Sequence, residues 1–334
     1  VLTILLSLAS LRAGQYENLL GEGTSLRQQG KLGEALGKFR EAISIEPKFV
    51  TAYYEALNIF NEMKAFDSTI VYAKKILGID SLHSSVRAAA YMAIGNSYGQ
   101  KDDFEKSVQA FREGISADPK SQILHFSLAV AFLRHGDMKE GADAIRQSLR
   151  LDPSHSGSNY YYARLLMNEG RRIQYLFAAL AAVALENNSP RAKQEVGNIE
   201  YVFETFGKRN GAAKVGKMAA NDSLLGSAEA ALEALAANGK NAKSNPGGYL
   251  QFNKRIECLL GTLPMLEQMD DEFTKTVYLD AFAKLKGENL GVALSRIVYA
   301  ASGDRESTSW CEKNKRKVEA CLKIMARERI RHDN

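Results

Sequence analysis

Cysteine, proline and tryptophan are scarce in this sequence of 334 residues, which contains three, six and one of them. The cysteines, Cys258, Cys311 and Cys321, are too few and of odd number for a disulfide framework. We expect Cys311 and Cys321 to share one helix, where a rise of about 1.5 Å per residue places them about 15 Å apart, too far for a bond. Buried free thiols are therefore expected.

Long apolar runs are also missing. None reaches the roughly 18 residues that a membrane-spanning helix needs, so the sequence predicts no transmembrane segment. The 44 basic and 39 acidic residues leave a net charge of +5, too small for a dedicated nucleic-acid binder, and we expect no nucleic acid among the partners. A hydrophobic fraction of 45% excludes a disordered chain.

The residue patterns of enzymes and metal sites are absent too. There is no HExxH or CxxC motif, and the five histidines are not paired at metal-ligand spacing. Gly211–Met218 (GAAKVGKM) resembles a phosphate-binding loop, but Met218 replaces the Ser or Thr that binds Mg²⁺ and no β-strand precedes it. We attribute this match to chance. The sequence thus predicts no catalytic residue, no metal and no cofactor, and a protein that is not an enzyme.

The positive charge is concentrated at the C-terminal end. Lys313–Asn334 contains eight basic and three acidic residues, a difference equal to the net charge of the chain. One interpretation is a segment that binds phosphates or a membrane surface. We favour a solvated last helix whose basic end suits the negative end of the helix dipole, because no aromatic residues alternate with the charges.

The chain begins with a short apolar block, Val1–Ser10 (VLTILLSLAS), followed by Ala13 and Gly14. This block resembles the apolar core and cleavage zone of a secretory signal peptide without its Met and basic segment. We expect residues 1–14 to be such a leader and the protein to be exported. The alternative is an ordinary first helix that packs against the next one.

Turn signals recur at a regular interval over the first 190 residues. Pro119 and Pro153 are 34 positions apart, and Pro47 precedes Pro119 by two such periods plus four residues, inserted within Ser81–Arg87. A second series lies between these markers: Gly30-Lys31, Met63-Lys64, Lys101-Asp102, Gly136-Asp137 and Gly170-Arg171. The interval predicts units of two helices each.

The residues inside the units carry a family pattern. In the third unit, Ser107 stands where Ala is usual, while the other marked positions match: Tyr91, Ile94, Gly95, Tyr98, Phe111 and Pro119. Five units in register resemble the tetratricopeptide repeat (TPR) family. Small residues such as Gly95 allow the two helices of a hairpin to approach, and large ones such as Phe111 fill the remaining gaps.

The resemblance implies an all-α fold: a TPR superhelix of about five helical hairpins over residues 16–190, followed by an irregular α-helical C-terminal region over residues 191–334. A degenerate hairpin is expected near residues 271–301. The layout also resembles exported multi-repeat TPR proteins of Gram-negative bacteria, which implies a periplasmic or envelope-associated protein.

The C-terminal region is predicted to be helical with two interruptions. Lys208–Asn221 is predicted to be a linker and Gly239–Gly248 a break. The predicted helices are Arg191–Gly207, Asp222–Asn238, Tyr249–Gln268, Asp271–Lys286, Asn289–Ala301 and Glu306–Arg331.

In the TPR family the first helix of each hairpin lines a concave face, so the resemblance also implies candidate binding residues. Amide side chains suit a peptide backbone, and Tyr, Phe and Met form apolar pockets. The predicted groove residues are Tyr54, Asn58, Asn61, Met92, Asn96, Phe126, Val130, Tyr160 and Arg164. The alternative is that Tyr54 and Phe126 only pack neighbouring first helices together.

One specialisation of the family is disfavoured. TPR proteins that clamp an acidic C-terminus use basic and amide side chains at set groove positions, and none of the matching positions here is basic: Leu20, Thr24, Glu55, Ala89 and Ala93. Binding of chaperone tails by that mechanism is not expected.

Three functional hypotheses remain. The leading one is a non-enzymatic module that binds an unidentified protein or peptide through the concave face. The second is a structural or self-associating component of a cell-envelope assembly. The third is an enzymatic activity of the C-terminal region, against which stands the lack of any nucleophile–base pattern.

Overall fold

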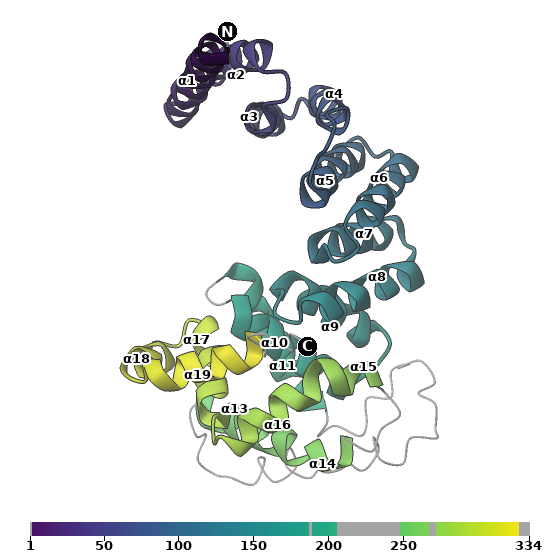
Figure 1. Cartoon of the computed structure of the whole chain (residues 1–334). Coiled ribbons are helices and arrows are strands. Elements are labelled where there is room, and N and C mark those ends of the chain that lie inside the picture. Colours follow the sequence, from purple (N-terminus) through teal and green to yellow (C-terminus); the bar gives the residue numbers. More distant parts are fainter. Residues whose placement is uncertain (1, 187–188, 206–247, 267–271, 327–334) are drawn as a thin grey trace. The chain divides into compact units, whose positions relative to one another are not determined.

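The computed structural model describes residues 2–186, 189–205, 248–266 and 272–326, and within these ranges all regular structure is helical (Figure 1). The chain divides into two compact units, Val1–Ala144 and Ile145–Asn334, each considered by itself below. The predicted all-α class and its TPR hairpins are confirmed. The predicted domain boundaries remain predictions.

Unit 1 consists of consecutive antiparallel helix pairs. Their order is α1 (Leu2–Gln28), α2 (Leu32–Ile45), α3 (Val50–Glu62), α4 (Phe66–Leu77), α5 (Ser84–Gln100), α6 (Phe104–Ala117), α7 (Gln122–His135) and the beginning of α8 (Met138–Leu151). The core lies between successive hairpins, where Phe39 of α2 packs with Ile59 and Phe60 of α3. Helix α1 continues through Ala13 and Gly14 without a break, and the leader hypothesis remains a prediction.

The predicted turns inside the hairpins share one backbone feature. A residue in the left-handed region occupies the same place in each turn: Gly30, Lys64, Asp102, Gly136 and Gly170. Glycine adopts this conformation without steric cost, and the other residues accept it within the turn. The turn series found in the sequence therefore marks the reversal of each hairpin.

Small residues set the distance between the paired helices of a hairpin. A Cβ atom on Gly95 of α5 would lie 2.5 Å from the Phe111 ring of α6, and one on Gly23 of α1 would lie 2.5 Å from the Phe39 ring of α2. Ser107, which departs from the family pattern, is buried and its hydroxyl donates a hydrogen bond of 2.8 Å to the Gly95 carbonyl. It therefore supports the same close approach.

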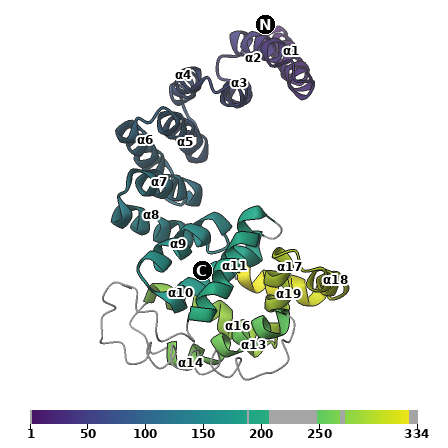
Figure 2. The same cartoon turned by 180° about the vertical axis from the view of Figure 1, so that it is seen from behind.

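Unit 2 is built around α10 (Arg172–Glu186), in which every residue from Ile173 to Ala184 is buried. The fifth predicted hairpin is α9 (Ser156–Asn168) with α10, and α11 (Pro190–Thr205) follows it. A helix that is apolar on all sides must be covered on all sides. The C-terminal region supplies part of this cover, because α17 and α19 pack against α10 (Figure 2).

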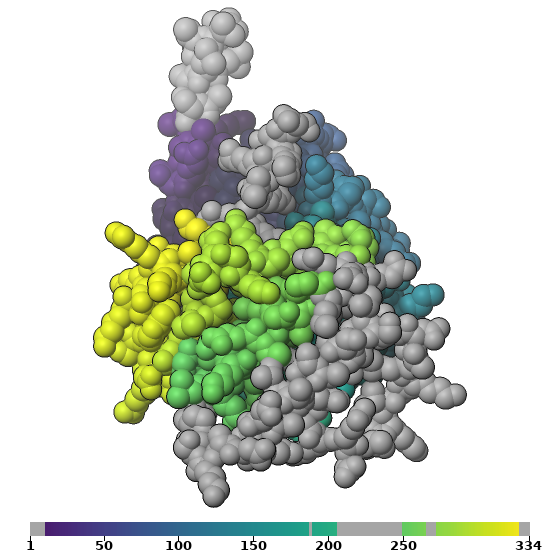
Figure 3. Space-filling model, turned by 90° about the horizontal axis from the view of Figure 1, so that it is seen from below, coloured from purple at the N-terminus to yellow at the C-terminus, as the bar shows by residue number. Residues whose placement is uncertain are grey.

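The C-terminal helices are more broken than predicted. They are α13 (Gly248–Gly261), α14 (Leu263–Leu266), α15 (Glu272–Thr274), a π-helical turn η1 (Lys275–Leu279), α16 (Asp280–Gly287), α17 (Gly291–Ala301), α18 (Arg305–Lys313) and α19 (Lys315–Ala326). Figure 3 shows, in green to yellow, the described part of unit 2 that follows residue 247. The predicted linker, the helix Asp222–Asn238 and the loop-like Gly211–Met218 lie outside the described residues.

Two predicted helices are wrong in their continuity. Tyr249–Gln268 is interrupted at Thr262, between α13 and α14. Pro264, the second residue of α14, has no backbone N–H group and cannot donate the hydrogen bond that would continue α13. Glu306–Arg331 is interrupted at Asn314, whose side-chain amide donates a hydrogen bond of 2.9 Å to the Trp310 carbonyl. An Asn side chain that competes for a helix carbonyl favours the end of that helix.

One buried hydrogen bond joins the fifth hairpin to the C-terminal region. The Tyr278 hydroxyl of η1 donates to the Asn159 side-chain oxygen of α9 at 2.8 Å, and both residues are buried. The Asn159 amide nitrogen in turn donates to the carbonyls of Pro153 and His155. This polar contact fixes η1 on α9.

We expect Gly95→Ala to destabilise the protein by about 2 kcal/mol, because the added methyl group forces the Phe111 ring or helix α5 to move. Urea unfolding measures the change. Gly37→Ala is the control: a Cβ there meets no atom within 4 Å, so the better helix former should stabilise the protein by about 0.5 kcal/mol or more. Equal effects of the two substitutions would contradict the close-approach argument.

We expect Tyr278→Phe to destabilise the protein by about 2 kcal/mol, because the Asn159 oxygen would stay buried without its donor. Thermal unfolding of Tyr201→Phe provides the control, since Tyr201 is 65% exposed. If the two variants melt alike, the hydrogen bond does not hold η1 on α9.

Candidate functional site

Eight of the nine predicted groove residues fall on two repeated positions of the first helices. Tyr54, Met92, Phe126 and Tyr160 occupy the first, and all four are half-buried. Asn58, Asn96, Val130 and Arg164 occupy the second, one helical turn later, and all of them except Val130 are exposed. The two positions have different surroundings.

The first position contacts the next first helix. The Tyr54 hydroxyl of α3 donates a hydrogen bond of 2.8 Å to the Val86 carbonyl of α5, and burial raises the pKa of Tyr54. In unit 2, the Tyr160 ring of α9 lies 4.8 Å from the Arg191 guanidinium of α11. The Tyr54 hydroxyl group is therefore used in packing between first helices, which was the alternative stated for this residue from the sequence.

The second position presents free amides in unit 1. Within the described residues, neither Asn58 nor Asn96 has a hydrogen-bond partner. Asn61, one turn beyond Asn58, differs, because its side-chain oxygen accepts a hydrogen bond of 3.2 Å from the Thr69 hydroxyl of α4. Two of the three predicted asparagines therefore present unused amides, and the third serves its own hairpin.

Arg27 of α1 forms ion pairs with α3. Its guanidinium donates to Glu55 at 3.0 Å and forms an ion pair with Glu62, so α1 is tied to α3. The hydrogen bond to Glu62 is the largest cause of the raised pKa of Arg27. Glu55, one of the positions where a clamp would need a basic residue, is thereby occupied by an internal ion pair.

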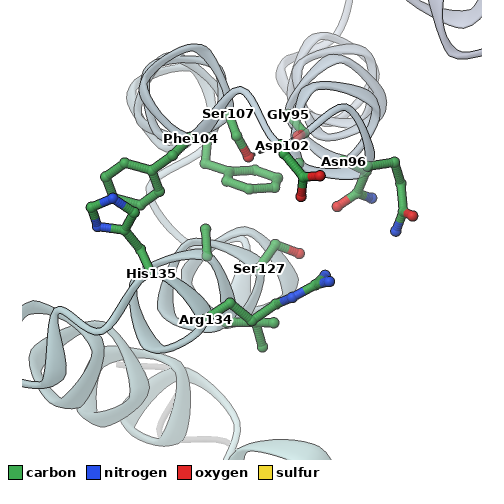
Figure 4. A pocket seen from close by; sticks show the side chains of 13 residues that line it. Gly95, Asn96, Asp102, Phe104, Ser107, Ser127, Arg134 and His135 are labelled. Atoms are coloured by element: carbon green, nitrogen blue, oxygen red, sulfur yellow. Dashed lines mark hydrogen bonds between the residues drawn. The ribbon is translucent and has the colours of Figure 1, made fainter.

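A pocket of 390 Å³ lies between α5, the α5–α6 turn and α7 (Figure 4). It brings together two of the predicted groove residues, Asn96 and Val130. Its lining also includes charged and aromatic side chains, among them Asp102, Phe104, Arg134 and His135. The repeat pattern pointed only to one face of the first helices, so it did not identify Asp102 of the α5–α6 turn, Phe104 at the start of α6, or Arg134 and His135 at the end of α7.

A Ser–His arrangement in unit 2 is structural. The hydroxyl oxygen of Ser158 lies 2.8 Å from His155 Nδ1 and 2.7 Å from the Ser148 hydroxyl. Both serines are fully buried, and the His155 ring caps α9 by accepting from the Ser158 backbone. Burial lowers the pKa of His155. A substrate has no access to this hydroxyl group.

The C-terminal basic cluster meets the helix dipoles in two ways. Lys313 and Lys323 lie in the last turns of α18 and α19, where the dipole favours them as expected, while residues 327–334 lie outside the described part of the chain. Because α18 ends at Lys313 and α19 begins at Lys315, Lys315, Arg316 and Lys317 occupy the first turn of α19, the positive end of its dipole. All are exposed, and in the described part of the chain none forms an ion pair. The dipole therefore disfavours these charges rather than stabilising them.

The three cysteines are free, as expected, but only Cys321 is buried, and burial raises its pKa to about 12. Across the described ranges, no group of three His, Cys, Asp or Glu side chains is arranged to hold a metal ion. None of the described helices combines the length and hydropathy required to cross a membrane.

Comparison with known proteins identifies the repeats. Residues 92–171 match the profile of the tetratricopeptide repeat family. The chain is 26% identical over 144 residues to the general transcriptional corepressor ssn6 of Schizosaccharomyces pombe, covering 40% of this chain and 13% of that protein. It is 24% identical over 115 residues to the small glutamine-rich tetratricopeptide repeat-containing protein 2 of Mycosarcoma maydis, covering 34% of this chain and 32% of that protein.

A solved structure with similar helices is pilF of Pseudomonas aeruginosa, at 17% identity and a TM-score of 0.44, over 58% of this chain and 91% of that one. The chain spans less than a third of the length of each of the two relatives named above. The repeat period, the turn geometry, the glycine contacts and the profile match agree. Residues 92–171 therefore contain repeats of the tetratricopeptide family, and the helical hairpins of this chain resemble those of TPR proteins.

Proposed function

We propose that this protein binds a peptide segment of a protein partner through the first-helix face of unit 1. TPR repeats are in general non-catalytic interaction modules, and this proposal assigns no chemical step to the chain. One observation carries the proposal: Asn58 and Asn96 occupy equivalent positions, both are exposed, and neither side chain is used within the described structure.

The chemistry of these amides suits an extended peptide. Each Asn side chain offers a carbonyl oxygen and an NH₂ group, and a peptide backbone offers the complementary donor and acceptor. Because α3 and α5 belong to consecutive hairpins, the two amides contact different residues of one segment. The half-buried Met92 lies one turn before Asn96 and supplies apolar contact area between them.

Asn58→Ala and Asn96→Ala should each weaken peptide binding by about 1 kcal/mol, or about fivefold, because each removes one net hydrogen bond. The peptides come from a random library of short linear peptides displayed on phage and selected on the purified protein. Calorimetry with the selected synthetic peptides measures the affinities. Gln109→Ala, on the exposed face of α6, is the control and should bind normally.

Failure of any peptide to enrich, or unchanged affinity in both asparagine variants, would overturn the proposal. Thermal melts of the two variants should not fall below that of the wild type, because neither side chain takes part in packing and Ala is the better helix former.

Tyr54→Phe should behave in the opposite way. Loss of the hydrogen bond to the Val86 carbonyl should lower the stability by about 1 kcal/mol, while the ring keeps its apolar contacts and peptide affinity stays unchanged. A melt and a titration on the same sample distinguish the two roles. A large loss of affinity with an unchanged melt would make Tyr54 a binding residue instead.

A further inference from the structure

The pocket between α5, the α5–α6 turn and α7 contains two opposite charges that no described residue neutralises. The neighbours of Asp102 are already engaged: Lys101 is paired with Asp67, and Asp103 with Lys106. Asp102 is exposed, and the described residues offer its carboxylate no partner.

Arg134, on the α7 side of the pocket, is in the same situation. The adjacent His135 lies 3.0 Å from Asp137 and stacks on the Phe104 ring at 3.7 Å between ring centroids. The guanidinium of Arg134 is exposed and, among the described side chains, forms neither an ion pair nor a cation–π contact. Figure 4 shows Asp102 and Arg134 on different walls of the pocket.

The pocket lining beside the two charges is mixed: Ser107 and Ser127 contribute hydroxyl groups, and aliphatic and aromatic side chains form an apolar part that is firmly held. Val130 and Ala131 of α7 line one side, and Phe111, which is 3% exposed, lies at the base. Phe104 is fixed between the His135 ring and the Phe132 ring, whose centroid lies 5.9 Å away. Asn96 stands at the α5 rim, so the free amide of the proposed peptide site adjoins this pocket.

This combination restricts what can bind. A ligand that covers the pocket removes water from both charges, and a charge that loses water without gaining a partner costs free energy. A ligand with charge of only one sign would leave Asp102 or Arg134 uncompensated. A ligand with one charge of each sign and an apolar group between them would satisfy both side chains and the floor.

We propose that the pocket selects, within the bound peptide, an apolar side chain flanked by one basic and one acidic residue. Asp102 pairs with the basic residue, Arg134 pairs with the acidic residue, and the apolar side chain contacts Val130 and Phe111. Asn96 holds the backbone beside them. This inference rests on the proposed function and names the chemistry of its partner.

The phage-selected peptides test the inference directly. They should carry an acidic and a basic residue on either side of an apolar one. Asp102→Asn and Arg134→Gln should each weaken binding of the synthetic peptides by about three- to tenfold, as expected for partly exposed charge pairs. Asp80→Asn and Arg305→Gln, which remove exposed charges outside the pocket, are the controls and should leave the affinity unchanged.

A double-mutant cycle identifies the partners. Replacing the basic residue of the peptide by norleucine should weaken binding to the wild type but not to Asp102→Asn, and replacing the acidic residue by glutamine should lose its effect in Arg134→Gln. Raising the salt concentration should reduce the wild-type affinity more than that of either variant. Melts that match the wild type exclude an effect through folding.

The outcomes separate this inference from the proposed function. If peptides enrich and depend on Asn96, but the cycle gives no coupling with Asp102 or Arg134, the charge selection is wrong and peptide binding stands. Enrichment of uniformly apolar peptides, or of peptides with charge of a single sign, has the same consequence. If no peptide enriches, both proposals fail.

Discussion

The close approach of the two helices in each hairpin is the constraint on which the rest of unit 1 depends. At Gly95 and Gly23, the absence of a side chain lets an aromatic ring of the second helix sit directly against the first helix. This contact fixes the rotation of the first helix about its own axis. The same rotation decides which of its residues pack and which face outward, so the face that we propose for binding follows from the contact inside the hairpin.

The first and third hairpins share this contact, and the hairpins between and after them repeat the same two-helix unit, so equivalent residues meet similar surroundings. The position of Tyr54 is directed at the next first helix and becomes part of the stacking, whereas the position one turn later remains outside it. A hairpin repeat has no large central core, so its stability comes from such neighbour contacts. Side chains that take no part in stacking are available to a partner. Asn58 and Asn96 occupy equivalent positions of this kind.

Much of this arrangement was predictable from the sequence, because it depends on residues at fixed intervals. The period of the turn signals located the hairpins, and Gly95 with Phe111 indicated the close approach. The pocket was not predictable in the same way. Asp102 and Arg134 come from a turn and a helix end, and only the folded chain brings these segments beside Asn96. Whether Tyr54 packs or binds was equally undecidable from its residue type, since a tyrosine suits both roles.

The C-terminal region has no repeat period from which its helix ends could be predicted. Local competition for a backbone carbonyl divided the predicted last helix at Asn314, and another predicted helix broke at Thr262, two residues before Pro264. Neither break has a period that would reveal it. A solenoid also needs a polar or covered end, because the last hairpin has no following neighbour. Helix α10 is too apolar to be that end by itself. The irregular helices that pack on it, held partly by the bond from Tyr278 to Asn159, meet this requirement in place of a further repeat.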